Sequence, residues 1–135
     1  FKNFDLITPN EREARFCLAD QDSSIGVLSS KLRDTTKFKN LILKLGSKGV
    51  LCVGKKNSDQ YFNFDSFAEN VLDPVGAGDA LLSYATLVYL KTKSLAKAGL
   101  IGSIAAACEC EKDGNIPIKV KDIFKKIEKI EKITN

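Results

Sequence analysis

Two glycines, Gly76 and Gly78, stand directly before an apolar stretch that runs from Ala80 to Leu90. Read at helical spacing, this stretch is apolar nearly all round, which predicts a helix buried on most sides. Glycine lets the backbone approach a ligand closely, and the first N–H groups of a helix have no partner within it. Residues 72–79 therefore predict a turn that can hold an anion at the start of a helix.

Asp79, the last residue of this turn, adds a carboxylate to the predicted anion site. A carboxylate is a poor ligand for phosphate because like charges repel, but it can act as a base beside a phosphate that the backbone holds. This combination suits phosphoryl transfer to a hydroxyl group. The alternative is a tight turn in which Asp79 only complements the dipole of the following helix.

The rest of the chain predicts strands that alternate with helices, which is typical of a layered α/β sheet. Strands are expected at 4–8, 40–45, 50–53 and 61–64, the last three forming a small meander with turns at 46–49 and 55–59. Helices are expected at 10–19, from 22–24 to 33–34, and at 80–90, 94–111 and 119–132. Gly114 and Pro117 are expected to end the fourth helix.

Three segments occur in an order and spacing that resemble those of a known family. They are Asp73–Asp79, Thr8–Ala14 with its Asn-x-x-Glu pattern, and Leu43–Val50. Together they resemble the ribokinase-like (phosphofructokinase-B type) carbohydrate kinases, which usually have two threonines in place of Pro74 and Val75. Within that family the chain is similar to the kinase domain of heptose-phosphate kinase/nucleotidyltransferase proteins of lipopolysaccharide-core synthesis.

This resemblance implies ATP-dependent phosphorylation of a hydroxyl on a sugar or sugar phosphate. Asp79 would be the catalytic base, and the N–H groups of Gly76, Ala77 and Gly78 would form the anion hole. Residues 1–135 would be the nucleotide-binding and catalytic C-terminal half of a layered α/β/α sheet, without the sugar-binding half and lid. The alternative is a nucleotide-binding or assembly module without turnover.

The resemblance also assigns the nucleotide side of the site. Asn10 and Glu13 would hold hydrated Mg²⁺ and the triphosphate, although the same pair could cap a helix, and both roles can coexist. Lys44 stands where many members of the family have threonine; it could reach a phosphate or simply extend into solvent. Gly46 and Gly49 are expected to be turn residues on the nucleotide side.

Two further residues have roles that stay open. By resemblance Asp73 would bind a monovalent cation such as K⁺ together with carbonyl groups near Val75, Lys112 and Gly114. Its alternative is a carboxylate that braces the loop by accepting backbone N–H groups. Ser103 stands where a family member has an asparagine that contacts adenine, which leaves the base preference open.

Two other motifs are excluded. Residues 49–56 begin like a phosphate-binding Walker loop, but Lys56 replaces the Ser or Thr that magnesium requires. Gly76 and Gly78 lack the third glycine of a dinucleotide fingerprint, because Leu81 occupies that position. A nicotinamide enzyme is therefore not expected.

The charge and cysteine patterns point to an ordinary cytoplasmic protein. The net charge of +4 arises mainly from 119–132, which predicts an amphipathic helix with a solvated basic face. Exposed aromatics that would stack on bases are missing, so no nucleic-acid partner is expected. The chain has no histidine, and its cysteines lack metal spacing, which predicts reduced core thiols at Cys17, Cys52, Cys108 and Cys110.

The ends and the hydropathy of the chain lead to three further expectations. No apolar run approaches the length of a membrane span, and no signal peptide is recognised, so no membrane partner is expected. The chain opens on Phe1 rather than Met, which predicts a fragment or a processed chain. On that reading the isolated chain would be inactive, and exposed apolar surface would favour self-association into a homo-oligomer.

Overall fold

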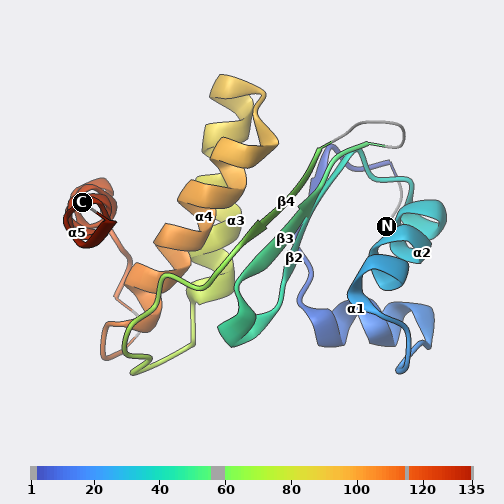
Figure 1. The fold of residues 1–135 in the computed structure, drawn as a ribbon, viewed down its shortest axis with the longest axis horizontal. Coiled ribbons are helices and arrows are strands. Elements are labelled where there is room, and N and C mark those ends of the chain that lie inside the picture. The colour runs from blue at the N-terminus through green and yellow to red at the C-terminus, as the bar shows by residue number, and fades with distance from the viewer. Residues whose placement is uncertain (1–2, 56–59, 115, 135) are drawn as a thin grey trace. The chain divides into compact units, whose positions relative to one another are not determined.

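The computed structural model describes residues 3–55, 60–114 and 116–134. The chain divides into two compact units, Phe1–Asp65 and Ser66–Asn135, and each is considered by itself. The first unit combines a sheet with two helices, and the second is helical (Figure 1). Among the described residues, no helix has both the length and the apolar character needed to cross a bilayer.

The sheet of the first unit has four strands in the order β1-β2-β3-β4. Their bounds are β1 Leu6–Ile7, β2 Asn40–Lys44, β3 Val50–Val53 and β4 Tyr61–Phe64. β1 runs parallel to β2, whereas β2, β3 and β4 pair antiparallel with Leu43 opposite Leu51 and Cys52 opposite Phe62. The predicted meander is confirmed. β1 is shorter than the expected 4–8, and Phe4 is exposed. Most of the turn expected at 55–59 lies outside the described residues.

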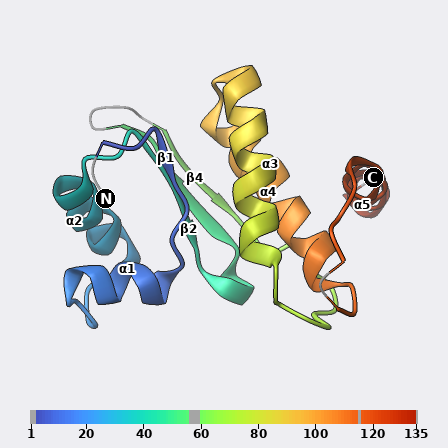
Figure 2. The ribbon, with the colours of Figure 1, turned by 180° about the vertical axis from the view of Figure 1, so that it is seen from behind.

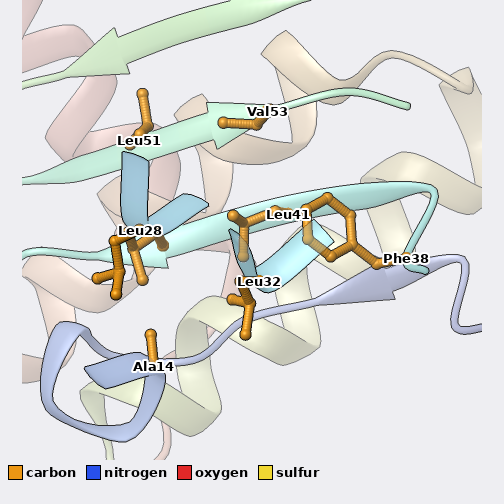
Figure 3. Close-up of a cluster of buried hydrophobic side chains, with 8 residues drawn as sticks. Ala14, Leu28, Leu32, Phe38, Leu41, Leu51 and Val53 are labelled. Carbon is orange, nitrogen blue, oxygen red and sulfur yellow. The ribbon is translucent and has the colours of Figure 1, made fainter. Parts of the chain in front are cut away.

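Two helices, α1 (Glu11–Leu18) and α2 (Ile25–Thr36), lie on one face of this sheet (Figure 1). Each begins at a polar side chain that accepts a backbone N–H: Asn10 Oδ1 from Glu13, and Ser24 Oγ from Val27. The sequence patterns therefore predicted both starts from capping chemistry. Apolar side chains of both helices meet those of β2 and β3 in one buried cluster (Figure 3): Ala14, Leu28, Leu32, Phe38, Leu41, Leu43, Leu51 and Val53.

The second unit contains α3 (Ala77–Thr92), α4 (Leu95–Cys110) and α5 (Val120–Thr134). α3 and α4 lie side by side as a hairpin (Figure 2). Gly102 of α4 permits their close approach, because a Cβ there would lie 3.0 Å from Ala85 Cβ and 3.1 Å from the Leu81 carbonyl oxygen. α5 packs on α4 through a cluster that includes Ile104, Cys108, Ile118 and Ile123.

One helix of this unit, α3, differs from the predictions in two ways. α3 begins at Ala77 rather than Ala80, because the first turn of a helix needs no internal N–H partner and so tolerates Gly78. It is not buried on most sides: Leu82, Leu87 and Leu90 are exposed. α4 agrees with the predicted helix at 94–111: it spans Leu95–Cys110, with Ser94 as its N-cap and Glu111 as its C-cap.

Burial also corrects two expectations about side chains. The basic face of α5 is not wholly solvated, since Lys126 is only 6% exposed while Phe124 is 61% exposed. Cys17 is exposed rather than in the core, whereas Cys52 and Cys108 are buried as predicted and Cys110 is half-buried. All four cysteines are free thiols.

Candidate active site

The turn before α3 has the geometry that its glycines suggested. Gly76 has φ +86°, a left-handed conformation that residues with a Cβ rarely adopt, and it caps the helix. The N–H of Ala77 donates to the Pro74 carbonyl at 3.3 Å, and the N–H of Ala80 donates to the Gly76 carbonyl at 2.9 Å to start the helix. The chain therefore reverses at Gly76 and enters α3 directly.

Two of the three predicted anion donors are free to bind a ligand. Among the described residues, the N–H groups of Gly76 and Gly78 have no acceptor, whereas that of Ala77 is already used within the turn. The side chain of Asp79 lies in the first turn of α3 and is exposed. Unpaired N–H groups at a helix N-terminus beside an exposed carboxylate can hold an anion and accept a proton.

Asp73 braces this turn, as one of its two predicted roles requires. Its Oδ1 accepts the N–H of Val75 at 2.9 Å. The N–H groups of Leu72 and Asp73 both donate to the Cys110 carbonyl, at 2.8 and 3.2 Å. The beginning of the turn is thus attached to the last residue of α4. Binding of a monovalent cation by Asp73 stays a prediction.

Ser103, the predicted base contact, lies within α4 and is 7% exposed. Its hydroxyl has no hydrogen-bond partner in the part of the chain that the structure describes. An unpaired buried hydroxyl costs about 1–3 kcal/mol. The structure therefore leaves a polar group unsatisfied at this position, and its role toward a nucleotide base stays a prediction.

In the first unit, the predicted magnesium pair forms a capping box at the start of α1. Asn10 Oδ1 accepts the N–H of Glu13 at 2.7 Å, and Glu13 Oε2 accepts the N–H of Asn10 at 2.7 Å. The capping role is thereby confirmed. It leaves the second carboxylate oxygen of Glu13 and the amide nitrogen of Asn10 for other partners.

The fold brings Lys44 to this helix start, although 33 residues separate it from Asn10. The two residues form a parallel β-bridge, and the N–H of Lys44 donates to the Pro9 carbonyl at 2.9 Å. The following turn depends on glycine: Gly46 has φ +61° and Gly49 has φ +84°. This turn carries the short 3₁₀ helix η1 (Gly46–Lys48) between β2 and β3.

A cleft of about 430 Å³ lies at this place in the first unit. Its lining comprises Asn10, Glu11, Arg12, Arg15, Gln21, Lys44, Leu45 and Gly46. Three predicted nucleotide-side residues share it, whereas Glu13 and Gly49 are not in the lining. Two arginines of this lining, Arg12 and Arg15, were missed by the sequence analysis; in the sequence they alternate with Glu11 and Glu13, so no basic cluster marked them.

The cationic side chains of this cleft differ in the number of partners that they already have within the protein. Arg15 bonds Glu11 at 2.8 Å and also donates to the carbonyl groups of Asp20, Gln21 and Ser23. It therefore holds the loop after α1 in place. Arg12 is exposed, and Lys44 is half-buried at the end of β2. These two side chains can contribute positive charge toward a bound anion.

The chemistry of this cleft fits a nucleotide phosphate with hydrated magnesium better than a metal held by protein alone. In the described ranges, no group of three or more His, Cys, Asp or Glu side chains could hold a metal ion. Magnesium commonly keeps several waters and takes one or two carboxylates together with phosphate oxygens. Arg12 and Lys44 supply cationic side chains to this cleft for such phosphate oxygens, whereas the free carboxylate oxygen of Glu13 is outside its lining.

Comparison with known proteins identifies the family. The model of the pfkB family of carbohydrate kinases matches residues 1–121. The chain belongs to this family. Its fold is the ribokinase-like α/β fold, here with a mixed four-stranded sheet.

Two solved structures illustrate this fold. Ribokinase from Thermotoga maritima has a TM-score of 0.78 and 26% identity, over 92% of this chain and 42% of that one. Phosphofructokinase-2 from Escherichia coli, solved with potassium, has a TM-score of 0.84 at 20% identity, over 96% of this chain and 42% of that one.

Among curated proteins, the bifunctional protein HldE of Helicobacter pylori J99 is 27% identical over 126 residues, which is 91% of this chain. HldE of Helicobacter acinonychis is similar to the same degree. The chain spans 27% of the length of each of these relatives.

Proposed function

We propose that this chain carries the nucleotide-binding and catalytic portion of an ATP-dependent kinase whose acceptor is a hydroxyl of a sugar or sugar phosphate. One observation supports it most: the turn at 73–79 has two unpaired N–H donors and the exposed carboxylate of Asp79 at the start of α3. Membership of a carbohydrate-kinase family supports phosphoryl transfer as the chemistry of this turn.

Asp79 is the proposed base, and the backbone before it is the proposed anion hole. The acceptor oxygen forms a bond to the γ-phosphorus, the bond to the bridging oxygen of ADP breaks, and the acceptor proton goes to a carboxylate oxygen of Asp79. The N–H groups of Gly76 and Gly78 donate to the oxygens of the transferring group, where negative charge builds up. ATP would supply that group, and Mg²⁺ would offset its charge.

The cleft of the first unit is the proposed holder of the nucleotide phosphates. Lys44 and Arg12 would balance the phosphate charge, and Asn10 and Glu13 would orient water molecules around magnesium. Gly46 and Gly49 of this unit would keep side chains away from the nucleotide. In the second unit, the proposed role of Ser103 is contact with a nucleotide base. Asp73 would also help to bind K⁺, the ion named in the structure of E. coli phosphofructokinase-2.

The proposed acceptor is a heptose phosphate of lipopolysaccharide-core synthesis, because the matched curated relatives are bifunctional HldE proteins. The sugar would be chosen by residues in a further half of the same protein. The proposal places the protein in the cytoplasm, where thiols stay reduced, and the four free cysteines fit that environment.

The substitution Asp79→Asn tests this function in the complete gene product that carries the sequence. It keeps the shape and hydrogen bonding of the side chain but removes its basicity. We expect kcat for acceptor-dependent ADP release to fall at least about a hundredfold, while ATP affinity changes only a few fold. Asp113→Asn is the matched control, since Asp113 is also an exposed aspartate of the second unit.

Two results would contradict the proposal. Turnover near wild type with Asp79→Asn would remove Asp79 from the role of base. ATP binding without ADP release over a panel of sugars and sugar phosphates would favour the alternative, a nucleotide-binding or assembly module. In the same assay the isolated 135-residue chain is expected to show no acceptor-dependent turnover.

A further inference from the structure

Lys126 of α5 is buried on the apolar side of an amphipathic helix. It is 6% exposed and lies one turn from Ile123, which is buried, and from Ile130, which is half-buried. The neighbouring Phe124 is 61% exposed. Burying an ammonium group is costly unless it is paired, so its partners must compensate.

Two carboxylates pair with this lysine. Lys126 Nζ lies 2.7 Å from Glu111 Oε1 and 3.3 Å from Glu69 Oε1. Lys129 Nζ lies 2.6 Å from the other oxygen of Glu69. The N–H of Glu69 donates to Glu111 Oε1 at 2.8 Å, so this one oxygen accepts from both the backbone and the buried ammonium. Two lysines and two glutamates make a neutral network.

The network contacts the two segments that are joined where the turn at 73–79 meets α4: the end of α4 and the residues just before the turn. Glu111 directly follows Cys110, whose carbonyl accepts the N–H groups of Leu72 and Asp73. Glu69 lies four residues before Asp73 in the segment that leads into the turn. Lys126 therefore links the segment before the turn to the end of α4, just beside the two hydrogen bonds that anchor the turn itself.

Two groups of this network, Lys126 and Glu69, have pKa values shifted toward their charged forms. Burial alone would lower the pKa of Lys126, but its bonds with Glu111 and Glu69 outweigh burial and raise that pKa above its ordinary value. Hydrogen bonds from Lys129 and Lys126 lower the pKa of Glu69. These shifts favour the charged forms of the Lys126 ammonium and the Glu69 carboxylate, so the contact between these two groups is present near neutral pH.

We propose that Lys126 is a positioning residue for phosphoryl transfer: through Glu69 and Glu111 it holds the segment from which Asp73 and Asp79 project. This inference rests on the proposed function. Lys126 itself lies beyond residues 1–121, which the family model matches, whereas Glu69 and Glu111 lie within that range. Catalysis depends on holding the base in place, and small displacements of a catalytic group lower kcat more than substrate affinity.

The substitution Lys126→Met in the complete gene product tests this. It keeps the apolar stem and removes the ammonium, which leaves Glu111 without its cation. We expect kcat to fall about tenfold or more while the KM for ATP stays within about threefold. Lys126→Arg should restore most of kcat, because a guanidinium can bond both carboxylates. Lys125→Met is the matched control, a neighbouring exposed lysine whose loss should change neither value.

Hydrogen exchange supplies a readout that does not depend on turnover. In Lys126→Met the amides of Leu72 and Asp73 should exchange at least about tenfold faster, while amides in the middle of α4 keep their rates. Unchanged kcat, or unchanged exchange at these two amides, would overturn the inference. If Lys126→Met does not fold, Glu69→Gln is the second variant. It removes the carboxylate charge that pairs with Lys126 at a more exposed position, and it should lower kcat and speed exchange in the same way.

The outcomes separate this inference from the function on which it rests. If the wild-type protein phosphorylates no acceptor, the proposed function fails, and the exchange measurement still decides whether Lys126 holds the turn. If the wild type is active and Lys126→Met is equally active, the positioning role fails and the function stands.

Discussion

Replacing Gly102 by alanine should loosen the contact between α3 and α4. An added Cβ would lie 3.0 Å from Ala85 Cβ and 3.1 Å from the Leu81 carbonyl oxygen, closer than side chains normally pack. One of these atoms belongs to the backbone of α3, so the helix itself would have to shift. Overpacking of this kind costs about 1–3 kcal/mol.

A second glycine allows the packing cost to be isolated. Gly26 lies near the start of α2, and a Cβ there would have no neighbour within 4 Å. Alanine favours a helix over glycine by up to about 1 kcal/mol, so Gly26→Ala should stabilise α2 slightly. At Gly102 the same gain partly offsets the clash. The difference between the two variants, about 1–3 kcal/mol, therefore reports the clash.

Native-state hydrogen exchange can measure this difference, because it gives the free energy of opening for each helix separately. We expect amides of α4 to lose protection in Gly102→Ala, and amides of α2 to keep or gain protection in Gly26→Ala. Equal stabilisation of the two helices would refute the reasoning, since it would mean that α3 does not lie against Gly102.

Two further predictions concern the turn and the thiols. Gly78→Val should weaken ATP binding at least about tenfold as well as lower turnover, because the side chain would fill the space where the phosphate is expected; unchanged affinity by isothermal titration in a folded variant would place the phosphate elsewhere. Iodoacetamide at pH 8 should label Cys17, which is exposed, and spare Cys52, because burial raises the pKa of the Cys52 thiol to about 12. Mass spectrometry of the native protein distinguishes the two sites, and labelling of Cys52 before Cys17 would contradict the assigned burial.

Much of the local structure could be predicted because its causes lie within a few residues. Asn10 and Glu13 satisfy each other's backbone N–H groups at a spacing of three, so the start of α1 was evident. The meander followed from apolar runs separated by glycine. The turn before α3 followed from Gly76 and Gly78, although the helix takes in Gly78 and so begins earlier than the apolar pattern suggested.

The candidate site was only partly predictable, because its other residues meet across long stretches of chain. Lys44 was marked as a candidate, but its bridge to Asn10 depends on β2 lying beside the end of β1. Arg12 and Arg15 drew no attention, since a charged helix surface is usually just solvated. Only the fold shows that these arginines line the same cleft as Lys44.

By itself, the sequence determined the local features: the capped helix starts, the meander, and a glycine turn that ends in the carboxylate of Asp79. Each depends on backbone conformation and hydrogen bonds between residues close in the chain. Tertiary structure alone decided which polar side chains are buried, because that depends on partners far away in sequence. Lys126 shows the reason: its ammonium can be buried only because Glu69 and Glu111, 57 and 15 residues away, converge on it to offset the loss of hydration.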